Sequence, residues 1–336
     1  MQVTQLEWII TLGVTIAVLL FDVVIIGRRP HEPSKRELSL ALSLYIGLAV
    51  AFGVWVYFFH GSQYGVEFFA GWLTEYSLSV DNLFIFLIIM ASFNVPKKFQ
   101  QQALLVGIIL ALVFRGIFIA LGAVAINQFS WVFYIFGAFL LYTAASLVRD
   151  TDHDDDADNF VVKFARSHLQ LTDKWEGLKL WIKEDGKRLM TPMFLVIVAL
   201  GTTDLIFALD SIPAIYGLTQ EPYLVFTANV FALMGLRQLY FLLGDLLKRL
   251  VYLSHGLAII LAFIGVKLIL HALHENEVPF INGGEHVAVP EIPTLLSLAV
   301  IIVVLIATTA ASLYKTRVKD KKESAEGDVT HPDALH

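Results

Sequence analysis

Nine long and nearly uncharged apolar runs constrain the fold of this sequence more than any other feature. A bilayer core of about 30 Å is crossed by about 20 apolar helical residues. The runs near that length cover residues 6–26, 38–59, 66–90, 103–126, 131–148, 193–216, 223–247, 253–273 and 294–314. The sequence therefore predicts an all-α polytopic membrane protein with nine transmembrane helices.

The segments outside these runs are too short for an independent soluble domain. One polar insert spans 149–192, and a charged stretch closes the sequence at 315–336. We expect a single transmembrane domain over 1–314, which includes the insert on the cytoplasmic side, followed by a disordered cytoplasmic tail.

The composition excludes several other classes of protein. Of the 336 residues, 57% are hydrophobic and only 16% are charged, against roughly 25% charged residues in soluble domains. The absence of cysteine excludes disulfides, iron–sulfur clusters, thiolate zinc sites and thiol redox chemistry. A formal net charge of −6 offers no basic face for phosphate backbones, so we expect the lipid bilayer as a partner and no nucleic acid.

The basic residues orient the chain. All Lys and Arg residues in connectors follow the first, third, fifth, seventh or ninth run, and the connectors at 60–65, 127–130, 217–222 and 274–293 contain none. Because cytoplasmic loops carry the basic excess, the N-terminus is predicted outside and the C-terminus in the cytoplasm. The first basic residue, Arg28, follows the first run, whereas a signal peptide carries basic residues before its apolar stretch, so this run is expected to stay.

The third and sixth runs share a Thr-acid-x5-Asp-(Asn/Ser) pattern. It comprises Thr74-Glu75 with Asp81-Asn82, and Thr203-Asp204 with Asp210-Ser211. The fourth and seventh runs each contain one arginine followed seven residues later by glycine, at Arg115 and Arg237. Runs three to five and six to eight therefore predict an inverted repeat of three helices, an architecture of secondary transporters. Chance similarity between hydrophobic segments is the alternative explanation.

Charged side chains inside the runs are the strongest functional signal. Each costs about 2.5 to 3.5 kcal/mol at the bilayer centre on insertion scales, so such residues are rarely present without a partner or a pathway. Away from the ends of the runs, the acids are Asp22, Glu75, Asp81, Asp204 and Asp210, and the bases are Arg115, Arg237 and Lys267. If all are ionised, two negative charges are in excess, and one divalent cation or two protons would neutralise them.

The oxygen-bearing side chains of the two acidic motifs form the candidate metal site. Its predicted ligands are Glu75, Asp81, Asn82, Asp204, Asp210 and Ser211, with Asp22, Arg115, Arg237 and Lys267 as supporting charges. Carboxylate, amide and hydroxyl oxygens suit Mg²⁺, Ca²⁺ or Mn²⁺ better than zinc, copper or nickel. In the alternative interpretation the acids only form buried ion pairs with the three bases, and the two roles can coexist.

Helix geometry limits how the acids can share one ligand. Two acids six residues apart point about 120° apart around an ideal helix axis. They can meet one small ion only if the helix is unwound or kinked, and Pro213 is expected to supply such a break in the sixth run. The third run contains no proline.

Polar clusters outside the runs carry weaker signals. The acidic stretch at 150–158 is best interpreted as a solvated charge run, with cation capture as the alternative, and residues 161–169 predict an interfacial helix. The cluster near the external end of the eighth run fits an exit-side metal site or ordinary loop polarity equally well. It consists of His271, His274, Glu275, Glu277, Glu285 and His286.

The acidic motifs resemble those of a known family. The segments are Glu75-Tyr-Ser-Leu-Ser-Val-Asp81-Asn82-Leu-Phe and Thr203-Asp204-Leu-Ile-Phe-Ala-Leu-Asp210-Ser211-Ile-Pro213-Ala-Ile, together with the stretch around Asn229 and Arg237. They are similar to the TerC family of integral membrane proteins and, within it, to the Alx-like bacterial members. The resemblance implies a bacterial inner-membrane protein of the LysE-like exporter group, tied to manganese efflux, with the two acidic motifs as its metal site.

The leading hypothesis is a membrane transporter, and not an enzyme, that exports Mn²⁺ from the cytoplasm by proton exchange or by uniport. Mn²⁺ is expected as the transported ion, with no other cofactor, and the sequence contains no G-x-x-x-x-G-K-(S/T) nucleotide-binding loop. One alternative is a membrane-bound redox modulator, which needs a cofactor. Another is a scaffold that supports metal homeostasis without transport. The choice among Mn²⁺, Ca²⁺ and Mg²⁺, the protein partners and the oligomeric state stay open.

Overall fold

The computed structural model describes residues 1–28, 34–129, 131–149, 172, 174–184, 187–247, 251–276, 278–279 and 281–329. These residues form ten α-helices, one β-hairpin and one short 3-10 helix, η1 (Asn282–Gly284). The helices are α1 (Gln5–Arg28), α2 (Lys35–Phe59), α3 (Ser62–Ser92), α4 (Lys97–Gln128), α5 (Val132–Arg149), α7 (Pro192–Tyr216), α8 (Pro222–Met234), α9 (Leu236–Leu247), α10 (Leu253–His274) and α11 (Thr294–Val329). Strands β1 (Trp181–Glu184) and β2 (Lys187–Met190) form the antiparallel hairpin.

The helical lengths confirm that this is a protein of membrane-spanning type. Seven helical segments of the described chain are long and apolar enough to cross a bilayer, and α8 and the first part of α9 together form one of them, Pro222–Leu242. Shorter apolar stretches, Gln5–Val18 and Val132–Val148, lie in α1 and α5 and correspond to the first and fifth expected spans. The full count of nine crossings and the inverted repeat stay predictions.

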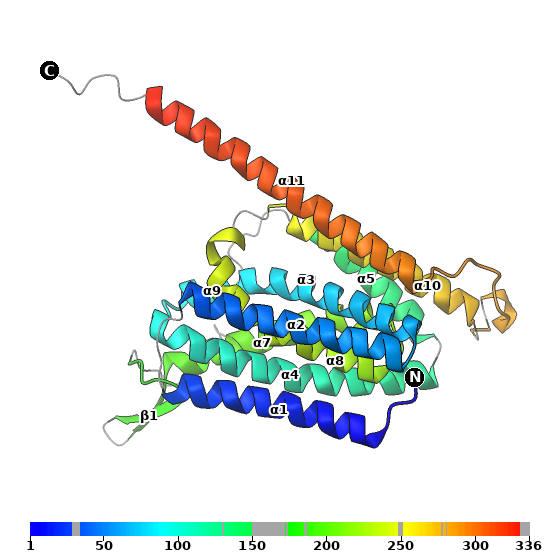
Figure 1. Ribbon diagram of the computed structural model, residues 1–336, viewed down its shortest axis with the longest axis horizontal. Helices are drawn as coiled ribbons and strands as arrows, with labels where there is room; N and C mark the ends of the chain where they lie inside the picture. Colours follow the sequence, from blue (N-terminus) through cyan, green and yellow to red (C-terminus); the bar gives the residue numbers. More distant parts are fainter. Residues whose placement is uncertain are drawn as a thin grey trace.

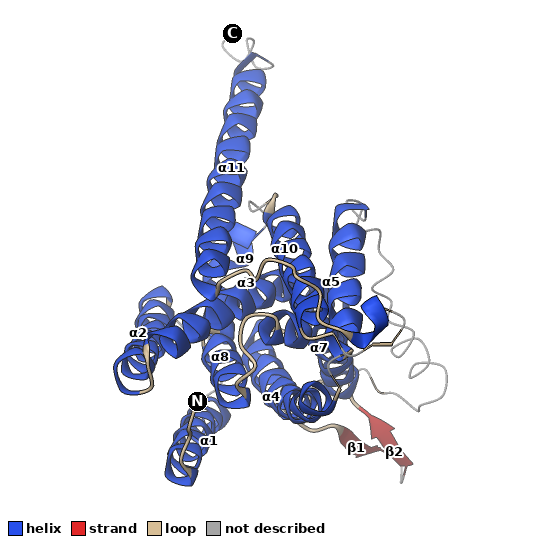
Figure 2. Ribbon diagram, turned by 90° about the vertical axis from the view of Figure 1, so that its right-hand side faces the viewer, coloured by secondary structure: helices blue, strands red, loops and turns tan. Residues whose placement is uncertain are grey.

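Four helices form the interior of the bundle and the others cover it. Figure 2 shows α3, α4, α7 and α8 in the middle, with α1 and α2 on one side and α5 and α10 on the other. Within the apolar windows, 78% of the residues of Pro222–Leu242 and 69% of Ser62–Ser92 are buried, against 11% of Thr294–Arg317. Polar side chains on α3 and α8 are therefore shielded from lipid, whereas the Thr294–Arg317 part of α11 presents mostly apolar side chains to its surroundings.

Small residues set the closest helix contacts. α5 packs along α10, where Gly137 and Gly265 face each other so closely that a Cβ on Gly137 would lie 2.8 Å from the Gly265 carbonyl oxygen. Close backbone approach at glycine is a common device of membrane helix packing, because lipid supplies no hydrophobic driving force between helices.

The prediction of a helix break at Pro213 is wrong. α7 runs without interruption through Pro213 to Tyr216. Pro213 removes one backbone donor from the helix, and α7 ends three residues later, at Tyr216. The interruption lies instead in the seventh expected span, at Gly235 between α8 and α9. Glycine is a poor helix former, and here it lets Leu42 and Tyr76 pack against the backbone, 3.2 Å and 3.6 Å from where a Cβ would stand.

The C-terminal part also differs from expectation. α11 continues as helix to Val329, whereas a disordered tail was expected from Lys315. Lys, Arg and Glu make up seven of the fifteen residues at 315–329, and these residue types have high intrinsic helix propensity. In Figure 1 the end of α11 projects beyond the other helices. Residues 330–336, the acidic stretch at 150–158 and the amphipathic segment at 161–169 lie outside the described residues.

The α5–α10 contact can be tested with a single methyl group. Gly137→Ala should lower the free energy of unfolding by about 1–3 kcal/mol, because the new Cβ overlaps backbone atoms of α10. Gly47→Ala in α2 is the matched control, since no atom lies within 4 Å of its Cβ position. Thermal unfolding in detergent measures both, and a Gly137→Ala protein as stable as the Gly47→Ala protein would contradict this packing.

Candidate functional site

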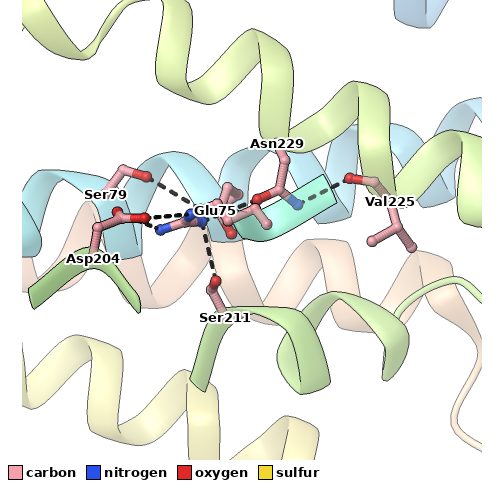
Figure 3. Close-up of polar contacts among 7 residues, drawn as sticks. Glu75, Ser79, Asp204, Ser211, Val225 and Asn229 are labelled. Atoms are coloured by element: carbon pink, nitrogen blue, oxygen red, sulfur yellow. Dashed lines mark hydrogen bonds and ion pairs between the residues drawn. The ribbon is translucent and has the colours of Figure 1, made fainter. Parts of the chain in front are cut away.

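Arg115 lies at the centre of a buried polar network. It stands near the middle of α4 and its side chain is 1% exposed. Its partners come from α3, α7 and α8, the other three interior helices (Figure 3). A guanidinium in such surroundings requires charged or hydrogen-bonding partners for every direction in which its donors point.

Asp204 of α7 receives a two-pronged contact from Arg115. Nε of Arg115 donates to Oδ2 of Asp204 at 3.4 Å, and Nη2 donates to Oδ1 at 3.2 Å. Asp204 is buried close to the middle of α7. The planar guanidinium fork matches the carboxylate in this geometry, which a lysine could not reproduce.

Glu75 of α3 is the second carboxylate on the same guanidinium. Its Oε1 forms an ion pair with Nη1 of Arg115 and accepts a hydrogen bond from Ser79 Oγ at 3.3 Å. Glu75 is fully buried, and no described residue donates to its other oxygen, Oε2. With both acids ionised, Glu75, Asp204 and Arg115 carry one negative charge in excess. A buried acceptor without a donor beside excess negative charge is a position where a cation or a proton would be stabilised.

Two neutral acceptors complete the network. Nη1 of Arg115 donates to Ser211 Oγ at 3.1 Å and to Asn229 Oδ1 at 3.0 Å. The amide of Asn229 is itself fixed, because its Nδ2 donates to the Val225 carbonyl one turn earlier in α8 at 2.9 Å. The guanidinium thus has both charged and uncharged partners within reach (Figure 3).

The six predicted metal ligands do not all meet in this structure. Glu75, Asp204 and Ser211 share Arg115, whereas Asp210 accepts a hydrogen bond from Thr143 Oγ1 of α5 at 3.0 Å. Asp204 and Asp210 therefore point to different partners, as their spacing of six residues predicts for a continuous helix. Asn82 is buried on α3.

The side chains of Asp81 and Asp22 lie outside what the structure describes, although both residues belong to helices, α3 and α1. In the described part of the chain no three acidic or imidazole side chains converge as a ready-made metal site. Two carboxylates do converge, and the Arg115 guanidinium occupies the position between them.

The other two predicted bases lie elsewhere. Arg237 belongs to α9, two residues after the interruption at Gly235. Lys267 of α10 lines a cavity of about 990 Å³ at the end of the bundle where α3 begins and α7 ends. Acidic residues from three segments also line it: Glu67, Glu221 and Glu291. Glu67 is buried and accepts hydrogen bonds from Gln63 at 2.9 Å and from Thr219 at 2.7 Å.

The histidines near the end of α10 pair separately. His271 lies 3.3 Å from Glu275, and His274 lies 3.5 Å from Glu291. His286 Nδ1 lies 2.5 Å from the carbonyl oxygen of His274. These contacts tie the loop to the helix end, and Glu277 lies outside the described residues.

Three polar residues of these contacts were not predicted as site residues. Asn229 and Thr143 are polar side chains within apolar spans, and that position is the sequence signal that could have found them. Ser79 stands four residues after Glu75, the spacing at which helical side chains meet.

Sequence comparisons agree with this membrane architecture. A family model described as "Integral membrane protein TerC family" matches residues 60–320, which include every residue of the Arg115 network. A membrane protein of Mycobacterium tuberculosis H37Rv, described as uncharacterised, is 48% identical over 322 residues, covering 94% of this chain and 81% of the relative. No solved structure matches the chain.

Two further relatives extend over almost their whole length. A membrane protein of Rickettsia felis is 34% identical over 316 residues, 94% of this chain and 100% of the relative. Alx of Salmonella typhi, which carries the provisional name of membrane-bound redox modulator, is 34% identical over 333 residues, 96% of this chain and 98% of its own.

Removal of the guanidinium tests the network. Arg115→Met should lower the free energy of unfolding by about 3–5 kcal/mol, because it leaves two buried carboxylates without a counter-charge. The triple variant Arg115→Met, Glu75→Gln, Asp204→Asn should regain a large part of that loss. Arg36→Met, at an exposed arginine of α2, is the control. Thermal unfolding in detergent measures the series, and a triple variant less stable than Arg115→Met alone would contradict the pairing.

Proposed function

The chain belongs to the TerC family of integral membrane proteins, and we propose that it is a secondary transporter that exports a divalent cation from the cytoplasm. The observation that carries this proposal is the pair of buried carboxylates, Glu75 and Asp204, which share one guanidinium near the middle of their helices. Structural ion pairing needs only one carboxylate for each arginine. The negative charge of the second carboxylate is energetically costly in the middle of a membrane unless a second cation binds at the site.

In the proposed mechanism Arg115 is an exchangeable counter-ion. An arriving divalent cation takes the place of the guanidinium between Glu75 and Asp204, whose oxygens are ligands that hard cations prefer. The displaced Arg115 keeps Ser211 and Asn229 as partners, since both already accept hydrogen bonds from its Nη1. The site then alternates between two occupied states, and neither leaves the carboxylates without positive charge.

The remaining predicted ligands extend the proposed path in both directions. α3 and α7 run in opposite directions through the bundle (Figure 1). Asp81 therefore lies about 9 Å from Glu75 toward one end of the bundle, and Asp210 lies about 9 Å from Asp204 toward the other end, at 1.5 Å per residue. We propose that Asp81 with Asn82 receives the cation on the cytoplasmic side and that Asp210 passes it outward.

The large cavity offers the outer exit. It reaches Glu67, two turns or about 12 Å along α3 from Glu75, and acidic side chains on its wall attract cations. This assignment places the cavity end outside and the C-terminus in the cytoplasm of a bacterial inner membrane. Lys267 and Arg237 remain proposed supporting charges.

Mn²⁺ is the proposed cargo. Oxygen ligands alone do not separate it from Ca²⁺ or Mg²⁺, and the choice rests on the TerC resemblance, which implies manganese efflux. A second candidate function follows from the provisional name of Alx, a membrane-bound redox modulator. The sequence contains no cysteine for thiol chemistry, so this role would need a bound redox cofactor. A metal-homeostasis scaffold without transport is the third candidate.

The transport proposal predicts how Mn²⁺ efflux from loaded proteoliposomes responds to loss of single charges. Mutation of outer-shell partners alone costs about 10- to 100-fold in metal affinity, so Glu75→Gln, Asp81→Asn and Asp210→Asn should each reduce flux by at least about tenfold. Glu176→Gln, at an exposed acid near the hairpin, is the matched control and should keep full flux. Unchanged Mn²⁺ flux in correctly folded Glu75→Gln and Asp210→Asn proteins would contradict the proposal that these carboxylates lie on the transport path.

Proton exchange makes a separate prediction. Protons that replace the exported ion enter from outside, so an outside-acid gradient should accelerate Mn²⁺ efflux from loaded liposomes, and an outside-alkaline gradient should slow it. The internal pH indicator should report acidification that requires Mn²⁺. If the rate of Mn²⁺ efflux does not depend on the pH gradient and the interior does not acidify, the protein is a uniporter and not a proton exchanger.

A further inference from the structure

The β1–β2 hairpin is fixed to the beginning of α7. The amide of Thr191, the residue before α7, donates to the Leu180 carbonyl at 3.0 Å, and its hydroxyl donates to the Lys179 carbonyl at 2.6 Å. Because α7 is apolar from its first turn, this attachment holds the hairpin at the level where a membrane span begins. Figure 1 shows the hairpin at the end of the bundle where α4 and α7 start.

A second contact fixes the same segment to α4. The ring of Trp175 stacks on Phe99 of the first turn of α4, with centroids 6.2 Å apart and planes at 17°. The Lys98 ammonium lies 4.8 Å from the centre of the Phe99 ring. Residues 174–184 and 187–190 are therefore tied to the ends of two spanning helices, so they lie beside the bilayer surface.

Basic side chains surround a pocket on this segment. The pocket has a volume of about 510 Å³, and among the described residues that line it four are basic and one is acidic. They are Lys174, Lys179, Lys183, Arg188 and Glu176, together with Trp181 and Ile182. Glu176 forms an ion pair with Lys179 at 2.7 Å, and the described residues that line the pocket include three more basic than acidic side chains.

The strand register brings two of these charges face to face. Lys183 pairs with Arg188 across the hairpin, and like charges directly opposite each other destabilise a strand pair. An anion that contacts both would remove this repulsion. The positions of the strand residues thus favour a ligand that carries negative charge at this point of the hairpin.

The same face of the hairpin carries an apolar ring. Trp181 is two residues from Lys183 and shares its face, whereas Ile182 points the other way and is buried against the protein. Trp181 is 56% exposed and Leu178 nearby is 40% exposed. Tryptophan beside basic residues at the end of an apolar span is the composition of a membrane interface, where rings reach the acyl boundary and cations meet phosphates.

We propose that this hairpin face binds the phosphate of an anionic phospholipid head group, with Lys183 and Arg188 on the phosphate and Trp181 at the acyl boundary. The preference is for anionic over zwitterionic lipid, because basic side chains outnumber the acidic one among the described residues that line the pocket. The site is independent of the cation path, since its residues are remote in the fold from Arg115.

Fluorescence quenching tests the proposal on the full-length protein in phosphatidylcholine vesicles that contain either brominated phosphatidylglycerol or brominated phosphatidylcholine. The Trp181 signal is the difference between the protein and its Trp181→Phe variant, which removes one of the six tryptophans. We expect brominated phosphatidylglycerol to quench Trp181 more strongly. Lys183→Gln with Arg188→Gln should lower the relative association constant for the anionic lipid by roughly thirtyfold.

Two control variants separate local binding from bulk charge. Lys315→Gln with Arg317→Gln removes two exposed basic residues of α11 and should leave the preference unchanged. Lys183→Arg with Arg188→Lys keeps the charges and should retain it. Equal quenching by the two lipids, or a preference that survives Lys183→Gln with Arg188→Gln, would overturn the proposal. Loss of the preference on addition of inorganic phosphate at constant ionic strength would instead assign the pocket to free phosphate.

Discussion

A single guanidinium shared by two buried carboxylates is the interaction on which the rest of this structure depends. Arg115, Glu75 and Asp204 come from three different helices, and none of them could be buried alone without a cost of several kcal/mol. The helices α3, α4 and α7 must therefore come together for any of the three charges to be accommodated. With both acids ionised, the same arrangement has one negative charge in excess, and no described residue donates to Oε2 of Glu75, so it goes beyond what structural pairing requires.

The surrounding helices keep this charged centre away from lipid. α3 and α8 are the most enclosed of the spans, and the outer helices expose apolar side chains instead. Glycine sets the closest approach of α5 and α10, and another glycine, Gly235, interrupts the span that carries Asn229 and Arg237. The interrupted span, formed by α8 and α9, thus carries Asn229, which is a partner of Arg115. An interrupted helix beside buried polar residues is the arrangement in which transporters hold ions at mid-membrane.

The sequence predicts the membrane class and the buried charges because hydrophobic length and charge within apolar runs are properties of the chain alone. It does not predict which acid meets which base, because that depends on the rotation of each helix and on contacts between distant segments. Asp204 meets Arg115, whereas Asp210 of the same motif meets Thr143. Asn229 is visible in the sequence as an isolated amide, but its partner lies 114 residues away. The break was expected at Pro213, where α7 stays helical, and it occurs at Gly235, where Leu42 and Tyr76 pack close to the backbone.

The most direct test of a cation site at Arg115 is an anomalous-scattering map of the protein crystallised with Mn²⁺. We expect a manganese peak within ligand distance of the Glu75 and Asp204 carboxylates, with the guanidinium moved onto Ser211 and Asn229. Absence of a peak there at saturating Mn²⁺, with Arg115 still in its two-pronged contact with Asp204, would contradict the proposal that Arg115 and the cation exchange places.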